Sequence, residues 1–427
     1  MSSRSFLLLI GAGGDGGAPY REFVLSRIAS AGHPIVLVDT AAPAWTIPYL
    51  APDHPHVCAD LSDPAAVAAA VKAFAADHNI GGVMAYMEHH VVTAPEIAQM
   101  LGLPSSSAEA MAAARDKATT RRLLDQHKVP SARAMEAPTL EAALTHADTI
   151  GYPVMVKPRS QAGSAGVVRA DNRGQIHEAY KRASSETVAG LEQYGPAGVL
   201  VEEYLDGAEI SVETAVLGAG QSRILAVTRK LPAPPGTTQE FGHVIDAADP
   251  LLHDADLAHV ISAAVDALGL TLGVLCIEVM LTATGPRIVE INGRLGGDLL
   301  PLLAQHALGI DLAQIAAALA TGTIPALEPT THAAAAIRFA YPFESGVLER
   351  LALHPAVGRI RELERAVLSQ RPGAFVSAPP HSTLDDRLAY WVVTGPNTAD
   401  CHTSLDQVAQ LIDVAITAPA AMTHCVR

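Results

Sequence analysis

The first hundred residues alternate short apolar runs with alanine-rich stretches, and this alternation restricts the fold more than any other feature of the chain. The apolar runs are Phe6–Ile10, Ile35–Val38 and Gly82–Tyr86, and the stretches with helical spacing lie near 19–31 and 64–77. Short strands separated by helices favour right-handed βαβ units and a parallel sheet. We therefore expect an α/β domain over residues 1–104, followed by a linker at 103–107.

The rest of the chain has longer strand candidates and predicts a mixed α+β arrangement. A helical pattern runs from Ser107 to about Gln126 and is closed by Pro130. The strand candidates are 153–157, 166–170, 199–205, 209–217, a hairpin of 273–281 with 287–291, and, further on, 334–339 and 388–393. A helix is expected over 256–268, and the proline-rich tract 230–236 is expected to form a substrate-facing loop.

Composition and charge exclude several classes of partner. The 427 residues include 44 acidic and 29 basic ones, a formal net charge of −15, without a run of Lys or Arg. Nucleic acids and anionic membranes are therefore poor partners, because both require a positive surface. No stretch approaches the ~20 apolar residues of a membrane span, and the first ten residues read as a strand that enters Gly11. The four cysteines, Cys425 among them, lack metal or redox spacing, so we expect a cytoplasmic protein.

A glycine-rich loop directly follows the first strand candidate. Gly11-Ala-Gly-Gly-Asp-Gly16 fits the pattern G-x-G-x-x-G, and Asp39 ends the next strand candidate. In a dinucleotide-binding domain such glycines approach a pyrophosphate, and the acidic residue binds a ribose hydroxyl. Any first turn of a parallel α/β domain favours glycine, however. We favour a tight turn beside a substrate pocket, and a nicotinamide-dependent oxidoreductase remains an alternative.

Four segments downstream carry side chains suited to one ligand, Mg-ATP. They are Arg115-Asp-Lys117, then Pro153–Pro158 with the turn Gln161–Gly166, then Val201–Glu209, and finally Cys276–Glu278 with Val289–Gly297. A lysine at the end of a buried strand can bind phosphates as a compact point charge. The backbone amides of a Gly/Ser turn can cover the remaining phosphates. A free strand edge at 202–205 can hydrogen-bond adenine, and Glu209 the ribose.

The last segment offers a set of oxygen ligands. Glu278, Glu290 and Asn292 supply carboxylate and amide oxygens, which Mg²⁺ prefers and Zn²⁺ does not. Glu290 and Asn292 are two residues apart on a strand and so share a face, which Glu278 on the partner strand can meet. An ionised Glu278 in an apolar strand costs several kcal/mol unless it is paired or metal-bound. His89-His90 lacks a further nearby ligand, so we interpret it as the rim of a pocket.

The order RDK, VMVKP, QAGSAGV, VEEYLDGAE, CIE and EINGRLGGD resembles that of the ATP-grasp superfamily over about residues 1–330. Within it the chain resembles carboxylate–amine ligases that join L-amino acids into dipeptides. EINGRLGGD is the most specific of these strings. The resemblance implies an ATP-grasp fold of α/β and α+β parts: an N-terminal parallel-sheet domain at 1–104, a small lobe at 105–198, a large lobe with the metal site at 199–330, and a C-terminal α+β segment at 331–427.

The resemblance also implies roles for individual residues, each at a matching position of a motif. Phosphate binding is expected of Lys117, Lys157 and the turn at Ser164, Ala165 and Gly166, and nucleoside binding of Glu202, Tyr204 and Leu205 for adenine and Glu209 for ribose. Binding of Mg²⁺ or Mn²⁺ is expected of Glu278, Glu290 and Asn292. The resemblance further implies that Arg294 steadies the transferred phosphoryl group and that His243 lies near the acyl substrate. We therefore count Arg294, Lys157 and His243 as candidate catalytic residues.

The expected reaction is the ATP-dependent formation of an amide through an acyl phosphate, with release of ADP and phosphate. The expected substrates are a small carboxylate and an amine, both amino acids, and a homodimer is possible only by analogy with relatives. A ligase of the purine-biosynthesis type acting on a ribotide remains an alternative. A non-catalytic ATP-binding regulator is another, but the intact set of lysines, acids and Arg294 disfavours it.

Overall fold

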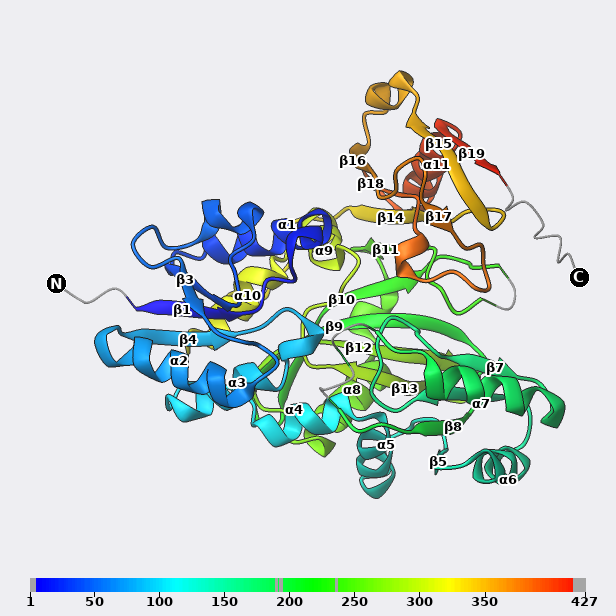
Figure 1. The fold of residues 1–427 in the computed structure, drawn as a ribbon, viewed down its shortest axis with the longest axis horizontal. Helices are drawn as coiled ribbons and strands as arrows, with labels where there is room; N and C mark the ends of the chain where they lie inside the picture. Colours follow the sequence, from blue (N-terminus) through cyan, green and yellow to red (C-terminus); the bar gives the residue numbers. More distant parts are fainter. Residues whose placement is uncertain (1–4, 189–190, 192–194, 235–236, 418–427) are drawn as a thin grey trace, which may run out of the picture.

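The computed structural model describes residues 5–188, 191, 195–234 and 237–417. The start of the predicted first segment (1–4), Pro235 and Gly236 of the predicted loop, and Cys425 lie outside the described residues. The described residues form four sheets. In Figure 1 the N-terminal domain (blue) lies on the left, the core (green) on the right, and the C-terminal segment (orange and red) at the top. The N-terminal parallel sheet and the antiparallel sheets that follow it agree with the α/β and α+β parts that the sequence predicted.

The N-terminal sheet is parallel, with the order β3-β2-β1-β4. Its strands are β1 (Phe6–Ile10), β2 (Ile35–Asp39), β3 (His56–Cys58) and β4 (Ile80–Met84), and its helices are α1 (Ala18–Ala29), α2 (Pro64–Asp77) and α3 (Thr93–Met100). Residues 7–10 of β1 are fully buried, which explains their continuous apolar run. Strand β4 starts two residues before the predicted 82–86. Its Gly82 lies against Ala320, where a Cβ would meet a backbone oxygen at 2.6 Å.

The small lobe is an antiparallel sheet of order β5-β8-β6-β7. Its strands are β5 (Ala134–Ala137), β8 (Val199–Glu203), β6 (Val154–Pro158) and β7 (Val168–Ala170), and its helices are α6 (Leu140–Ile150) and α7 (Ile176–Ser185). The helical pattern predicted over 107–126 is present. It forms two helices, α4 (Ala108–Arg115) and α5 (Lys117–Gln126), separated at Asp116, whose carboxylate caps α5 and pairs with Arg159.

The largest sheet has the order β13-β12-β9-β10-β11-β14-β18-β16 and is antiparallel throughout. Its strands are β13 (Gly285–Asn292), β12 (Gly273–Thr282), β9 (Ala208–Gly218), β10 (Gln221–Lys230), β11 (Gly242–Asp246), β14 (Ala334–Ala340), β18 (Ala389–Gly395) and β16 (Leu363–Leu368). Helix α8 (Ala255–Ala267) packs on one face. The C-terminal segment therefore extends the sheet of the core.

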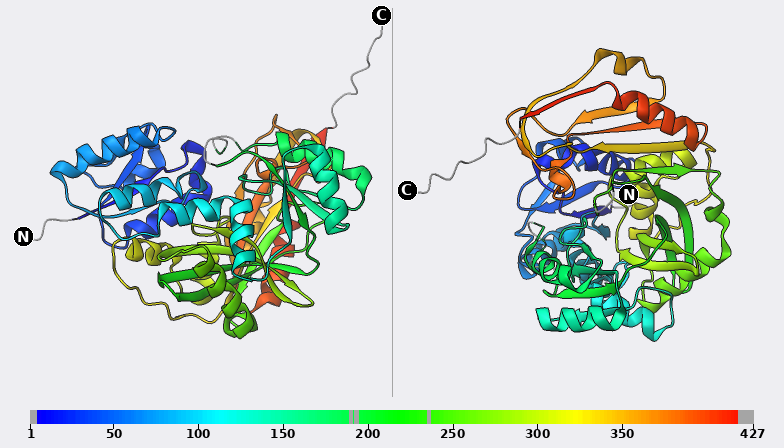
Figure 2. Two further views of the ribbon diagram at one scale, coloured as in Figure 1. Left: turned by 90° about the horizontal axis from the view of Figure 1, so that it is seen from below. Right: turned by 90° about the vertical axis from the view of Figure 1, so that its right-hand side faces the viewer.

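The remaining C-terminal elements form a second layer. Strands β15 (Gly346–Leu353), β17 (Phe375–Val376) and β19 (Ile412–Thr417) make a small sheet, and α11 (Thr398–Ala409) packs on β14 and β18. In the right-hand view of Figure 2, this orange and red layer lies over both the blue N-terminal domain and the green core.

One apolar core joins the N-terminal domain to the large sheet. It contains β1 and β2 side chains together with helices α9 (Leu300–Leu308) and α10 (Leu312–Ala320), which pack against both sheets. No single described helix is long and apolar enough to cross a membrane; α9 and α10 pass such a test only as a pair, and that pair is bent by 107°. Because the two bodies share this core, we expect them to unfold together.

Leu303 of α9 is fully buried in the shared core. We expect Leu303→Ala to lower the free energy of unfolding by about 2–5 kcal/mol, because it removes buried methyl groups and leaves a cavity. The exposed Ile324, which is 80% accessible, provides the control, and Ile324→Ala should change stability by less than about 0.5 kcal/mol. Denaturant titration would measure both. A Leu303→Ala loss as small as that of the control would contradict the shared core.

Candidate active site

The three predicted metal ligands lie on one face of the large sheet. Strands β12 and β13 pair so that Glu278 lies opposite Glu290, and Cys276 lies opposite Asn292. Residues directly opposite each other on antiparallel strands project from the same face, and so do residues two apart. The register therefore brings Glu278, Glu290 and Asn292 together, as their spacing indicated.

The same face continues over the next three strands with further titratable side chains. Glu209 of β9 lies opposite Met280, two residues from Glu278, and Lys230 of β10 lies opposite His243 of β11. The opposite face carries the apolar side chains that pack against α8. We call the set of Asn292, Glu290, Glu278, Glu209, Lys230 and His243 the polar face.

Lys230 is the central cation of the polar face, and the sequence analysis did not identify it. Its Nζ lies 2.6 Å from Glu209 Oε1, 2.5 Å from Glu240 Oε1 and 3.7 Å from Glu278 Oε1. Burial by itself lowers the pKa of Lys230, but these carboxylates, Glu240 foremost, raise it well above its usual value. The predicted loop 230–236 thus begins with a residue that belongs to the end of β10.

The donor set at the β12–β13 hairpin fits a magnesium ion. Burial, together with nearby carboxylates such as Glu209 and Glu290 and despite Lys230, raises the pKa of Glu278 to about 8. A divalent cation would offset this accumulation of negative charge. Asn292 donates its amide nitrogen to the Cys276 carbonyl oxygen at 3.3 Å, which leaves its amide oxygen as a ligand.

Lys117 connects the small lobe to this hairpin. Its Nζ donates to the Gln161 carbonyl oxygen at 2.7 Å and pairs with Glu290 Oε1 at 2.8 Å. The Lys117 ammonium, predicted to bind phosphate, therefore contacts both the start of the Gly/Ser turn and a predicted metal ligand. The Lys117 and Glu290 side chains are only 8% and 23% exposed, so their attraction is weakly screened by solvent.

Lys157 lies at the end of β6 and is also buried. Its Nζ lies 2.5 Å from Glu202 Oε2, and Arg121 binds the same carboxylate at 3.0 Å. Burial lowers the pKa of Lys157, with a further contribution from Lys117 and Arg121, while Glu202 opposes the shift. Lys117 and Lys157 are therefore close enough to influence each other, as their predicted binding to one phosphate chain requires.

The predicted free edge at 202–205 is wrong for Glu202. Strand β8 is central in its sheet, with Glu202 opposite Ala134 on one side and Met155 on the other. Its side chain neutralises Lys157 and Arg121. The strand pairing ends at Glu203, so Tyr204 and Leu205 lie beyond the paired region. Any adenine contact through the backbone must come from these last two residues.

The Gly/Ser turn adopts backbone conformations that suit close approach of a ligand. Gly163, Ser164 and Gly166 have φ values of 63°, 59° and 71°. The Gly166 N–H donates to Glu186 Oε2 at 2.7 Å, and the Ala165 N–H donates to the Ala162 carbonyl oxygen at 3.3 Å. Phosphate binding by Ala165 and Gly166 therefore requires these two hydrogen bonds to be exchanged.

Arg294 follows the hairpin and reaches the N-terminal domain. Its Nε donates to Glu88 Oε2 at 2.6 Å, and Arg115 Nε lies 3.4 Å from the other oxygen of the same carboxylate. Glu88 begins the short 3₁₀ turn Glu88–His90, so His89 and His90 follow it in the same turn. A small cavity of about 80 Å³ with mostly apolar walls borders Arg294.

A buried acid, Glu213, limits which residue can occupy position 296 in the string EINGRLGGD, and no pattern in the sequence indicated it. Glu213 of β9 is fully buried and accepts the Gly296 N–H at 3.2 Å, and burial raises its pKa to about 7. A Cβ at Gly296 would lie 2.3 Å from Glu213 Oε1. Glycine is therefore required where the chain turns away from the metal strand.

His243 lies between two carboxylates. Its Nε2 is 3.3 Å from Glu240 Oε2 and 3.2 Å from Asp298 Oδ2. Asp298 in turn accepts two hydrogen bonds from Arg387, at 2.6 and 2.8 Å, and the Arg387 guanidinium stacks 3.6 Å from the centre of the Phe339 ring. Asp298 and Arg387 were missed. Asp298 is the last residue of the string EINGRLGGD, whereas no motif surrounds Arg387.

Glu240, His243 and Asp298 are spaced so that they could also hold a metal ion. Arg387 already binds Asp298 with both nitrogens, and Lys230 pairs with Glu240. Burial by itself lowers the pKa of His243, but Glu240 and Asp298 raise it to about 9, which keeps the imidazole protonated at neutral pH. A protonated imidazole cannot ligate a metal, so the chemistry of this cluster disfavours one.

Asp39, the acid that accompanies the N-terminal glycine loop, binds backbone amides of the protein itself. Asp39 Oδ2 accepts the Ala12 N–H at 3.0 Å, and Oδ1 accepts the Thr40 N–H at 2.8 Å. These bonds hold the turn after β1 and engage the carboxylate that a dinucleotide would need for its ribose. The structure thus favours a tight turn at 11–16.

The raised pKa of His243 makes folding dependent on pH. The folded-state value of about 9 exceeds the unfolded value of about 6.5, so its stabilisation is complete below pH 6.5 and is lost as the pH rises through 9. The loss is on the order of 3 kcal/mol. We expect denaturant titrations across this range to show the decline, and His243→Gln to make it shallower by the His243 share, while Glu278, with its raised pKa of about 8, keeps a decline of the same sign. The exposed His127→Gln control should retain the wild-type slope; an equally steep slope in His243→Gln would contradict the assignment.

Family models match two parts of the chain. A model described as the ATP-grasp domain matches residues 150–301, and one described as the ATP-grasp N-terminal domain matches residues 28–105. The first match covers the turn at 161–166, both hairpin strands and Arg294. The second covers most of the parallel sheet.

Individual proteins are similar to this chain in sequence or in fold. A D-alanine–D-alanine ligase of Gloeobacter violaceus is 32% identical over 234 residues, which are 50% of this chain and 72% of that protein. Human carnosine synthase 1 is 29% identical over 267 residues, 58% of this chain, but the match spans only 31% of that longer protein. The crystal structure of an L-amino acid ligase from Bacillus licheniformis has a TM-score of 0.78 at 20% identity, covering 98% of this chain and all of that one.

Proposed function

The chain belongs to the ATP-grasp family of carboxylate–amine ligases, and we propose that it joins two small amino acids into a dipeptide, with ATP converted to ADP and phosphate. The observation that carries the proposal is the position of Lys117, whose ammonium contacts both the Gly/Ser turn and Glu290. A phosphate chain coordinated through Mg²⁺ to Glu290 would take the place of this contact. The site residues given below are part of the proposal.

ATP fits between the small lobe and the polar face. Lys117 and Lys157 supply two buried positive charges, and the turn at 161–166 supplies backbone amides for the terminal phosphates. Tyr204 and Leu205 follow the last paired residue of β8 and are placed to bind adenine. Glu209 lies on β9, the next strand along the chain, for the ribose, and its carboxylate is paired with Lys230.

The substrate cleft lies where the N-terminal domain meets the hairpin. Arg294 and Glu88 form an ion pair there, a cation and an anion that match the carboxylate and the ammonium of an amino acid. The cavity beside Arg294 has a volume of about 80 Å³, which suits a small side chain. The Nδ1 of His243 has no hydrogen-bond partner in the described part of the chain, so it can donate to a bound carboxylate.

These side chains can promote the reaction by charge and position. A substrate carboxylate oxygen bonds to the γ-phosphorus while the bond from that phosphorus to ADP breaks. A neutral amine then bonds to the carbonyl carbon of the resulting acyl phosphate as the carbon–oxygen bond to phosphate breaks, and the proton that the amine loses leaves with the phosphate. Arg294 and Lys157 stabilise the charge on the transferred group. Bound Mg²⁺ supplies further charge neutralisation at the phosphates. His243 acts as a hydrogen-bond donor and not as a base, because its pKa of about 9 keeps it protonated.

A screen of phosphate release tests the substrate class. Amino acids supplied singly and in pairs with Mg-ATP should release phosphate, with one ADP and one dipeptide formed per phosphate. Chromatography and mass spectrometry would identify both products. Phosphate release with glycinamide or aminoimidazole ribotides, and none with amino-acid pairs, would replace the dipeptide proposal with the ribotide alternative. Stoichiometric AMP would contradict the acyl-phosphate mechanism itself.

Glu290→Gln tests the metal ligand. A neutral amide is a much weaker ligand of Mg²⁺ than a carboxylate, so we expect turnover to fall at least about 100-fold, or roughly 2.7 kcal/mol in the activation barrier. Glu344→Gln, a matched change at an exposed position, should leave turnover unchanged. Circular dichroism would confirm that both variants fold. Turnover of Glu290→Gln within about tenfold of wild type would refute the role of this carboxylate.

A further inference from the structure

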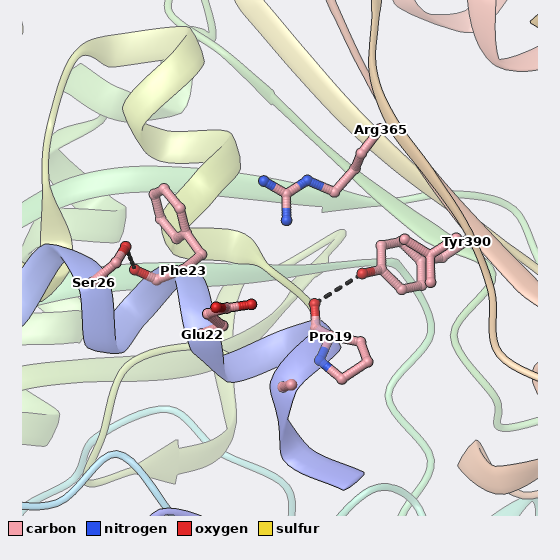
Figure 3. A pocket seen from close by; sticks show the side chains of 8 residues that line it. Pro19, Glu22, Phe23, Ser26, Arg365 and Tyr390 are labelled. Carbon is pink, nitrogen blue, oxygen red and sulfur yellow. Dashed lines mark hydrogen bonds between the residues drawn. The ribbon is translucent and has the colours of Figure 1, made fainter. Parts of the chain in front are cut away.

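A cavity of about 440 Å³ opens between helix α1 and strands β16 and β18, and none of the residues proposed for ATP, metal or substrate lines it (Figure 3). Its walls are formed by Ala18, Pro19, Glu22, Phe23, Ser26, Arg365, Val367 and Tyr390. We propose that this cavity is a second binding site, for a small zwitterion that carries a carboxylate, an ammonium group and an apolar side chain. The proposal goes beyond the ligase function and does not depend on it.

Arg365 provides the site for the carboxylate. Its guanidinium extends from β16 toward the space above α1 (Figure 3), and its Nε is buried without a hydrogen-bond partner among the described residues. The paired acid nearest to it is Glu364, whose Oε1 lies 3.5 Å from Nη2, too far for a strong charge-assisted bond. A buried N–H without a partner is unfavourable, and a carboxylate is the group that a guanidinium binds with two parallel hydrogen bonds.

Glu22 provides the opposite charge on the α1 wall. One of its carboxylate oxygens accepts a hydrogen bond from Tyr49 at 2.9 Å, which fixes the side chain. Within the described ranges, no ion pair joins Glu22 to Arg365, although both line the same cavity and are drawn facing it in Figure 3. A ligand with a carboxylate and an ammonium group can bind both. A simple anion would be repelled by Glu22, and a simple cation by Arg365.

The remaining walls are apolar and held in place. Phe23 and Val367 offer hydrocarbon surface, and Tyr390 is fixed by its hydroxyl, which donates to the Pro19 carbonyl oxygen at 2.8 Å. Ser26 donates to the Phe23 carbonyl oxygen at 2.6 Å, so its own oxygen can accept from an ammonium group. The volume is within the range of roughly 300–1,000 Å³ typical of sites for small molecules. An amino acid with an aliphatic side chain has the matching chemistry.

A crystal of the full chain soaked with L-selenomethionine, without ATP, tests the location. Selenium scatters anomalously, so its position distinguishes this cavity from the catalytic cleft. We expect an anomalous peak beside Phe23 and Val367, with the ligand carboxylate on Arg365. A peak only beside Arg294, or no peak, would overturn the proposal.

Calorimetry with L-leucine tests the site in solution. Arg365→Gln and Glu22→Gln should each raise the Kd of one binding event at least about tenfold, because each removes a charge-assisted hydrogen bond. Arg361→Gln, which removes an exposed arginine four residues from Arg365, should leave the Kd unchanged. Glu22→Gln should not weaken binding of 4-methylpentanoate, which lacks the ammonium group. Unchanged Kd values in both cavity variants would overturn the proposal even if a crystal showed selenium there. Since ATP is absent, failure of the ligase proposal would not alter these results.

Discussion

The neutralisation of buried carboxylates on one face of the large sheet is the constraint on which the rest of the structure depends. Glu209, Glu240 and Glu278 share the ammonium of Lys230, and Glu290 is paired with Lys117 from the small lobe. A buried acid without a partner would be costly, and pairing lowers this cost; Glu278, with a pKa of about 8, is the acid whose charge the lysines compensate least. Because the cations come from different elements, their pairing also holds the lobes in register. A nucleotide and its metal ion would enter by exchanging partners within this network, so that lysines released by the acids could pair with phosphate.

The C-terminal segment completes the site although it contains no recognisable motif. Strands β14 and β18 extend the sheet beyond β11, and this extension places Arg387 against Asp298. Asp298 contacts His243 and, together with Glu240, raises its pKa, so Arg387 is linked to the polar face through Asp298. The same segment closes the cavity over α1 with Arg365 and Tyr390. Its position over both the core and the N-terminal domain, seen in Figure 2, explains how one layer serves two sites.

Local patterns in the sequence were sufficient for the elements that they define. Strand β1 and helix α2 have the bounds that periodicity indicated, and the two-residue spacing of Glu290 and Asn292 gave their common face. The sequence did not indicate which distant strands pair with one another or which of their side chains come into contact. Strands β10 and β11 were not predicted as strands, so the position of Lys230 among the acids and the contacts of His243 could not be predicted. The interpretation of Glu202 failed for the same reason, since whether a strand is central or at an edge is decided by β5 and β6, far away in the chain.

The central claim is that Glu278, Glu290 and Asn292 hold the metal ion of a nucleotide bound between the lobes. A crystal grown with Mn²⁺ and a non-hydrolysable ATP analogue measures this directly, because manganese scatters anomalously and replaces magnesium at oxygen ligands. The account predicts a manganese peak at coordinating distance from these three side chains, with the Lys117–Glu290 contact broken and Lys117 on phosphate. The cluster of Glu240, His243 and Asp298 offers the alternative position. Manganese bound there, with Lys117 still paired to Glu290, would contradict the account.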